Sequence, residues 1–499
     1  MDLVKDSVRK SLELAFGVLL VAGGLLFLAV AVRMITCPQE VVITEGAIRE
    51  AVCRLASGHN IYDISNLQHP PFLVAQYPPL FYLVTGALVR LFGESFWPGR
   101  LVSSFSSLAT ALILGLVVRR KSGSRSFGAA AGLVYLSFYH VVMWGTTHRV
   151  DSLGILLSVA GVALYERARE AGPGRAKLWI AAALFLGALL TKQVLVAGAA
   201  AATIDLLIER RWGRAAGLAA AVLVPFGVVF LALDLATGGG FRTMTVLGTV
   251  SAAADPPWTV FLNAGTFFGS AFILATLVVC LFLLLRSGRP DIWGLMVLFG
   301  LPWAILTDAN IPRFMEPLAA MAVVLCAGLA VLRRRESGEY AIALMLLVCA
   351  LAVSFLYEER VTIVRERLMN LHAGNSRDQF AEALARHSTP GGAVLAQDLG
   401  VVLGARRRVY LNDPYVFSML RGNGAWEPDD LAEGARRRRF EAIVLNRPVE
   451  SLRPGEWVTL WIHPAADAIR ENYVLAETLT SAESYRFYEP TRYFYVPRD

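Results

Sequence analysis

The sequence predicts an all-α polytopic membrane domain followed by a small extracytoplasmic α/β domain. First, 56% of the 499 residues are hydrophobic and only 17% are charged, whereas soluble domains have about 25% charged residues. Second, the apolar residues gather in blocks of about 17–25, long enough to cross a bilayer. Third, the composition becomes that of a soluble protein from about residue 358. We therefore expect a membrane domain over 1–357 and an α/β domain over 358–499.

About eleven apolar stretches are expected to span the membrane as helices. They cover 12–34, 99–118, 127–145, 152–166, 178–191, 193–208, 215–236, 261–285, 291–306, 315–332 and 340–357. The first stretch is too long for the apolar region of a signal peptide and lacks a small-residue cleavage site before Cys37. It is therefore expected to be a retained anchor.

The loops between these stretches alternate in charge. Lys and Arg gather in loops such as 119–125, 167–177 and 210–214, while the intervening short loops hold at most one each. Positive loops stay in the cytoplasm, so the N-terminus is expected inside and the C-terminal domain outside. These basic loops account for the net charge of +7, so no nucleic-acid partner is expected. The alternation requires 78–93 to be a juxtamembrane or re-entrant helix, with a short membrane span as the alternative.

The first outer loop, 35–98, is predicted to contain an amphipathic helix that begins at Glu45. Its apolar residues follow helical spacing, and charged residues occupy the opposite face. Thr44 is a candidate N-cap and Gly58 a candidate stop. Such a helix lies in the membrane interface and would hold Glu45 at the outer surface. The residues that form the apolar face are Ile48, Ala51, Val52 and Leu55, and those on the charged face are Arg49, Glu50 and Arg54.

Two of the five cysteines, Cys37 and Cys53, lie in this outer loop. On the oxidising side of the membrane they could form a disulfide. The alternative is a pair of buried thiols. The other three cysteines lie in predicted spans and are expected to pack there.

The C-terminal segment contains short apolar runs at 391–398, 406–413 and 440–446, which are predicted to be strands. A helical pattern at 429–440 separates the second run from the third. Strands that alternate with helices predict a mainly parallel sheet. The aromatic stretch 485–496 is predicted to be an edge hairpin. The segment has no nucleotide-binding fingerprint.

Candidate site residues gather at the predicted outer ends of the spans. Asp151 opens the span 152–166, and His148 and Arg149 precede it. An Asp in a first helical turn also interacts favourably with the helix dipole, which is the structural alternative. Ionisable groups at membrane depth usually face a cavity, so we expect Glu45 and Asp151 to converge in one outer cavity.

Two further cations are expected on the same side, Lys192 and Arg313. The alternative for Lys192 is a side chain that reaches from the bilayer to water. For Arg313 the alternative is a salt bridge with Asp308 or Glu316. His59 and His69 have no metal-like spacing with any carboxylate. No cofactor is required by any motif, and a divalent metal is left open.

Carboxylates and cations at an outer membrane surface fit one reaction class well. A sugar leaves a lipid phosphate, and an acceptor hydroxyl attacks it. The attack needs a general base, which a carboxylate supplies, and the leaving phosphate needs positive charge. A lipid-linked donor is expected because nucleotide sugars are absent outside the cytoplasm.

The motifs resemble the GT-C superfamily of polytopic glycosyltransferases, in the branch of family 39, the aminoarabinose transferases and the protein O-mannosyltransferases. Five stretches carry the resemblance, in the family's order: 43–63 (its DEG and G-x-x-x-Y-D pattern), 77–84 (PPL-x-Y), 149–165 (R-x-D-x-L), 189–193 (TKQ) and 313–324 (the later E-P segment). Thr44 stands where the family often has Asp, Tyr77 where the aminoarabinose branch has Lys, and Pro312-Arg313 where Asn-Tyr is common. These departures argue against an aminoarabinose transferase.

The resemblance implies a GT-C fold, a polyprenyl-phosphate sugar donor and usually inversion at the sugar. It implies that Glu45 acts as, or positions, the base and that Asp151 is the second acid of the site. The acceptor is a lipid, a glycan or a protein. The residues expected to bind substrate are Arg149, His148, Tyr77, Tyr82, Lys192, Arg313 and Glu316. A membrane transporter and a non-catalytic membrane scaffold are the alternative functions.

Overall fold

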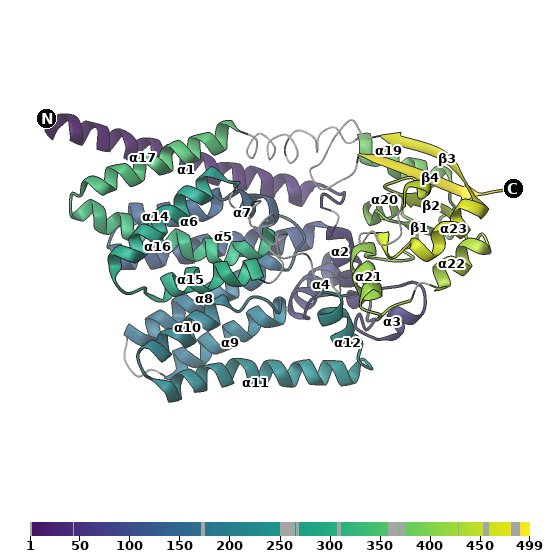
Figure 1. Cartoon of the computed structure of the whole chain (residues 1–499), viewed down its shortest axis with the longest axis horizontal. Helices are drawn as coiled ribbons and strands as arrows, with labels where there is room; N and C mark the ends of the chain where they lie inside the picture. The colour runs from purple at the N-terminus through teal and green to yellow at the C-terminus, as the bar shows by residue number, and fades with distance from the viewer. Residues whose placement is uncertain are drawn as a thin grey trace. The chain divides into compact units, whose positions relative to one another are not determined.

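A computed structural model describes residues 2–42, 44–170, 175–249, 265, 269–306, 311–357, 368, 375–427, 429–452, 459–480 and 490–499 (Figure 1). The chain divides into two compact units. The first unit comprises 1–35, 100–228 and 256–368. The second comprises 36–99, 229–255 and 369–499. The contacts therefore group the first outer loop with the C-terminal segment.

The first unit is helical. Its helices are α1 (Asp2–Thr36, whose last residue lies in the second unit), α5 (Trp97–Ser122, from Arg100), α6 (Arg125–Ser137), α7 (Tyr139–Trp144), α8 (Asp151–Glu170), α9 (Arg175–Thr191), α10 (Ala197–Ile208), α11 (Trp212–Ala236, to Val228), α14 (Ala271–Ser287), α15 (Ile292–Leu306), α16 (Met315–Arg334) and α17 (Gly338–Leu356). Helix α16 lies at the centre, since it packs against α6, α8, α14, α15 and α17.

Among the described residues, five helices are long and apolar enough to cross a membrane by length and composition. They are Asp6–Thr36, Trp97–Ser122, Trp212–Ala236, Pro312–Arg334 and Gly338–Leu356. The other predicted spans correspond to shorter helices or, for α8, to one that carries charged residues near its end. The predicted span 261–285 begins outside the described residues.

The predicted span 127–145 is two helices rather than one. The backbone of Phe138, between α6 and α7, is extended, with φ −68° and ψ 132°. The buried Phe138 ring packs against Phe272 of α14, with 5.4 Å between ring centroids. The apolar composition of this stretch could not reveal the break, because it contains no Pro or Gly at that point.

The second unit combines short helices with a four-stranded sheet. The helices are α2 (Glu45–Ala56), α3 (Ser65–Gln68), α4 (Leu80–Phe92), α12 (Gly240–Arg242), α19 (Asn375–Arg386), α20 (Leu399–Gly404), α21 (Pro414–Gly422), α22 (Asp429–Arg436) and α23 (His463–Asn472). A π-helical turn, η1 (Thr243–Leu247), follows α12, and two 3₁₀ turns lie at Ile311–Phe314 in the first unit and Val449–Ser451 in the second. Helix α4 holds most of the stretch 78–93.

The sheet has the order β1-β2-β4-β3, with β1 (Ala393–Ala396), β2 (Phe440–Leu445), β3 (Tyr473–Thr480) and β4 (Thr491–Pro497). Only β1 and β2 are parallel, and the other two pairs are antiparallel. The sheet is therefore mixed, and the expectation of a mainly parallel sheet was wrong. Strand β4, from the stretch predicted to be an edge hairpin, is an inner strand paired with β3, and 481–489 lie outside the described residues.

The predicted strand 406–413 does not join this sheet as a strand. Val409 forms an isolated bridge with Val394, and Leu411 forms one with Phe72 of the first outer loop. The backbone of Arg406 has a positive φ of 54°, which turns the chain before the apolar run. The apolar run is buried, as its composition indicates, but its main partner is a segment far away in sequence.

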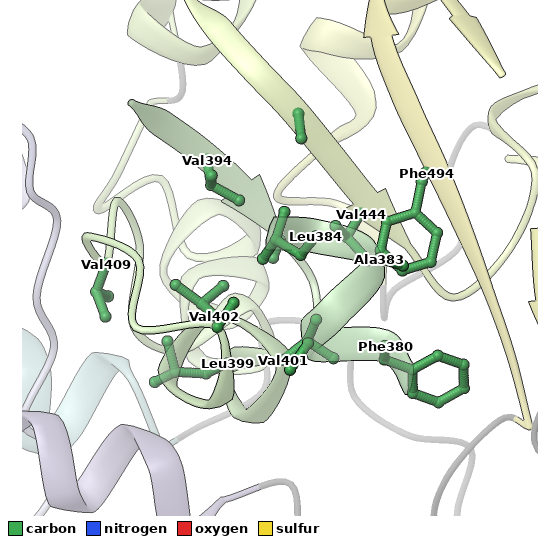
Figure 2. Close-up of a cluster of buried hydrophobic side chains, with 14 residues drawn as sticks. Phe380, Ala383, Leu384, Val394, Leu399, Val401, Val402, Val409, Val444 and Phe494 are labelled. Carbon is green, nitrogen blue, oxygen red and sulfur yellow. The ribbon is translucent and has the colours of Figure 1, made fainter. Parts of the chain in front are cut away.

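One hydrophobic core supports this end of the second unit. Figure 2 shows side chains of α19 and α20 gathered against the strands, in one cluster that includes Leu384, Val402, Val394, Val444 and Phe494. The burial of these aliphatic and aromatic side chains is the main stabilising contribution to the sheet domain.

Candidate active site

Helix α2 places Glu45 at its first position, and Gly58 follows the helix with a φ of +88°. Both predicted ends are therefore confirmed. Thr44 occupies the N-cap position, but its side chain makes no capping hydrogen bond. The predicted apolar face is buried at Ile48, Ala51 and Val52, together with Glu45 itself, whose exposed fraction is 0%.

The Glu45 carboxylate is held by the loop that precedes it. Its Oε2 accepts hydrogen bonds from the backbone N–H groups of Val41, at 2.9 Å, and Val42, at 3.3 Å. These two bonds fix the side chain's orientation, since they come from a backbone that is itself buried at both residues. The Glu45 carboxylate is thus an oriented, water-poor group.

A second buried carboxylate, Glu40, accompanies Glu45. Its Oε1 accepts the backbone N–H of Gly46 at 2.6 Å, and only 3% of the residue is exposed. Glu40 therefore performs the N-terminal capping of α2 that we expected from Thr44. Sequence reasoning missed Glu40; the available signal was a lone acidic residue in an apolar stretch, only five positions before Glu45.

In the first unit, Asp151 joins two cations at the start of α8. Its Oδ2 accepts a hydrogen bond from Arg149 Nε at 3.0 Å, and its Oδ1 accepts one from Lys192 Nζ at 2.5 Å. The side chains are buried, with exposed fractions of 1%, 5% and 7%. We call Arg149, Asp151 and Lys192 the ion cluster.

Contacts from α5 and α7 fix the arginine of this cluster. The Ser103 hydroxyl donates to the backbone carbonyl of Arg149 at 2.9 Å, and the guanidinium lies 5.0 Å from the centre of the Trp144 ring. His148 is also fully buried beside it. A planar cation held on an aromatic face and by a carboxylate is a rigid group.

Lys192 lies in the short connection between α9 and α10, where its backbone N–H donates to Ala188 O at 2.9 Å. Its buried side chain points to Asp151 and does not reach to water, so the alternative of a snorkelling lysine was wrong. Arg313 is near enough for its charge to act on the Lys192 ammonium. Asp308, the alternative partner of Arg313, lies outside the described residues.

Glu316 contacts other helices. Its Oε1 accepts the Ser158 hydroxyl of α8 at 2.6 Å and the Gly198 backbone N–H of α10 at 3.3 Å. Ser158 lies seven residues after Asp151, which is about 10 Å of helical rise. The contacts of Glu316 therefore join α16 to α8 and α10.

Tyr77 and Tyr82 belong to the second unit and are both buried. The hydroxyl of Tyr62 donates to the Tyr77 carbonyl at 2.6 Å, and the Tyr62 ring meets Tyr82 edge-on at 6.4 Å. Burial, together with the nearby Tyr82, holds the pKa of Tyr62 well above its usual value. These contacts fold the end of the loop motif, Tyr62-Asp63, onto the Pro-Pro segment that follows it.

The two candidate acids lie in different units, Glu45 in the second and Asp151 in the first. Their convergence in one cavity stays a prediction. Among the described residues, no group of three or more His, Cys, Asp or Glu side chains is arranged to hold a metal ion. Cys37 and Cys53 are buried and are not joined by a disulfide, which corresponds to the second of the two alternatives that the sequence left open.

Comparisons with known proteins point to one fold. Residues 76–233 match the family described as dolichyl-phosphate-mannose-protein mannosyltransferase. The structure of ArnT from Cupriavidus metallidurans, solved with undecaprenyl phosphate, is similar with a TM-score of 0.57 and 14% identity over 96% of this chain and 97% of that one. The oligosaccharyltransferase of Archaeoglobus fulgidus, tethered to an acceptor peptide, is similar with a TM-score of 0.53 and 12% identity over 96% of this chain and 74% of that one.

No curated protein matches the sequence. The expected fold class, a polytopic helical domain with a small sheet domain near the C-terminus, is confirmed. The long apolar helices indicate an integral membrane protein.

Proposed function

We propose, on the premise that this chain is a GT-C superfamily glycosyltransferase, that it transfers a sugar from a polyprenyl-phosphate donor to an acceptor on the extracytoplasmic face. The observation that carries the proposal is the ion cluster at the start of α8. A buried carboxylate that holds two cations in a fixed arrangement suits the recognition of a lipid phosphate. The undecaprenyl phosphate in the similar ArnT structure supports this class of donor.

In the reaction, the acceptor hydroxyl attacks the anomeric carbon while the bond from that carbon to the phosphate oxygen breaks. The bonding pair leaves with the phosphate, where the charges of Arg149 and Lys192 stabilise it. The hydroxyl proton passes to a carboxylate, and we assign that role to Glu45. Because the hydroxyl attacks from the side opposite to the leaving phosphate, the configuration at the anomeric carbon is inverted.

Asp151 has a different role in this proposal. Both of its carboxylate oxygens accept hydrogen bonds from cations, which makes it poorly suited to take the proton. We infer that it positions Arg149 and Lys192 for the phosphate. Arg313, whose charge acts on Lys192, adds to the positive potential for the leaving group.

The acceptor class is open between a lipid, a glycan and a protein. The acceptor peptide of the archaeal oligosaccharyltransferase makes a protein acceptor a reasonable first trial. The topology proposed here, with the N-terminus in the cytoplasm and the sheet domain outside, places the reaction on the side where lipid-linked donors replace nucleotide sugars.

The test is transfer by the purified protein in nanodiscs, with synthetic polyprenyl-phosphate hexoses and pentoses and with release of polyprenyl phosphate as the readout. Glu45→Gln should lower kcat by about 10²–10⁴, the usual contribution of a general base. Glu50→Gln is the matched control, because Glu50 lies on the same helix and pairs with Arg54 on the charged face. Equal activity of both variants would remove Glu45 from the mechanism.

Lys192→Gln tests the phosphate site in the same assay. It should weaken donor binding and slow transfer, whereas Lys10→Gln, at a side chain 71% exposed, should do neither. Addition of EDTA to the wild type decides whether a divalent metal takes part. Donor transport into sealed vesicles without any sugar transfer would refute the proposed reaction.

A further inference from the structure

The segment Tyr410–Asn412 of the C-terminal domain pairs with Phe72–Val74 of the first outer loop. The backbone N–H of Phe72 donates to Tyr410 O at 2.7 Å, and that of Asn412 donates to Phe72 O at 3.2 Å. The two segments are more than 300 residues apart in sequence, and both belong to the second unit. The C-terminal domain is therefore attached to the loop that carries Glu45.

The side chain of Asn412 extends this pairing to helix α2. Its Oδ1 accepts the Val74 N–H at 2.9 Å, and its Nδ2 donates to Val74 O at 3.0 Å and to Ala47 O at 3.4 Å. Ala47 is in the first turn of α2, two residues after Glu45. Only 1% of Asn412 is exposed, so both ends of its amide are buried and hydrogen-bonded.

A second contact joins Gly400 of the C-terminal domain to Glu40, the buried acid that lies five residues before Glu45. A Cβ atom on Gly400 of the C-terminal domain would lie 2.5 Å from Glu40 Oε2 and 3.0 Å from Glu40 Cβ. The Glu40 side chain therefore lies directly against the Gly400 backbone. Since Glu40 also accepts the Gly46 N–H, the position of Gly400 constrains the residue that follows Glu45.

The attachment does not depend on these contacts alone. The Phe72 ring packs edge-on against Tyr410, Phe417 and Trp426, with centroid distances of 5.9, 6.0 and 5.6 Å. Buried aromatic rings in edge-on contact stabilise such a pairing independently of its hydrogen bonds. Loss of the Asn412 amide should therefore leave the loop attached to the domain but less precisely oriented.

We propose that Asn412 is a positioning residue for Glu45, and that the C-terminal domain acts in catalysis by orienting the first turn of α2. This inference rests on the proposed transferase function. Asn412 does not itself react. Its three hydrogen bonds hold the carbonyl of Ala47 and both backbone groups of Val74, and they fix the direction in which α2 begins.

The experiment compares Asn412→Ala with Asn423→Ala in the full-length protein. Asn423 is a matched control because it lies in the same domain and donates to the carbonyl of Leu247 at 2.7 Å, a residue outside the first outer loop. Asn412→Ala should lower kcat by about 10- to 100-fold, as expected for a misplaced reacting group, with the donor KM changed less than about twofold. Asn423→Ala should retain the wild-type kcat.

Hydrogen exchange provides a readout that is independent of activity. Amides of residues 40–56 should exchange faster in Asn412→Ala than in Asn423→Ala, and Gly400→Ala should show the same local effect. Equal exchange of this segment and an equal kcat in both Asn variants would overturn the positioning role. If the wild type transfers no sugar, the proposed function fails, and the exchange data alone still decide whether Asn412 orients α2.

Discussion

A double-mutant cycle on Asp151 and Lys192 tests the ion cluster most directly. In Asp151→Asn, two cations lose the carboxylate that they share. A hydrogen bond to a charged group contributes about 1.5–3 kcal/mol, and removal of one member of a buried ion pair costs about 3–5 kcal/mol. We therefore expect Asp151→Asn to lower the free energy of unfolding by about 3–5 kcal/mol.

Lys192→Met should be milder, because Asp151 keeps its bond from Arg149 at 3.0 Å. The expected loss is about 1.5–3 kcal/mol, equal to one charge-assisted hydrogen bond. In the double variant only Arg149 is left without its carboxylate. The combined loss should therefore be smaller than the sum of the two single losses, by about 1–3 kcal/mol.

The assay is reversible unfolding by SDS in mixed micelles, followed by circular dichroism, for the wild type and the three variants. A cycle on Glu50 and Arg54 is the control, since that i,i+4 pair on α2 is partly exposed and should couple by only about 0.3–0.5 kcal/mol. Strictly additive losses for Asp151 and Lys192 would refute the direct, buried contact between them.

Three further outcomes are expected. Burial raises the pKa of the Cys53 thiol to about 12, so only about one Cys53 thiol in 10⁴ is ionised at pH 8. Alkylation of Cys53 by iodoacetamide should therefore be slow until the protein is unfolded. Rapid labelling of Cys53 in the folded protein would contradict its burial. Phe72→Ala should lower the free energy of unfolding by about 3–5 kcal/mol, which is measured as a lower Tm. The control variant Leu475→Ala, at a side chain 45% exposed, should change the Tm little. Equal shifts in Tm for the two variants would argue against the aromatic attachment. A C-terminal alkaline phosphatase fusion should be active and a C-terminal green fluorescent protein fusion dark in cells, and the reverse result would invert the proposed topology.

The sequence predicted several local features well, because composition and spacing report directly on burial and on helix ends. The spacing of apolar residues located α2, and the glycine at position 58 marked its end. The same reasoning failed at Thr44, because the group that caps α2 is Glu40, from outside the helix. It also failed at 406–413, whose apolar run indicated burial but not the identity of the strand it would meet.

Of the candidate site residues, the sequence identified Asp151 and Lys192 as separate candidates, and the structure joined them through a contact between residues 41 positions apart. Nothing in the sequence indicated that the Asn412 side chain would donate a hydrogen bond to the Ala47 carbonyl, since that contact spans 365 positions. The reason is physical. Hydropathy and periodicity describe how each segment meets water or lipid, which is a local property. The partner of a buried charge or amide depends on which distant segment the folded chain brings within about 3 Å, and only the tertiary structure decides that.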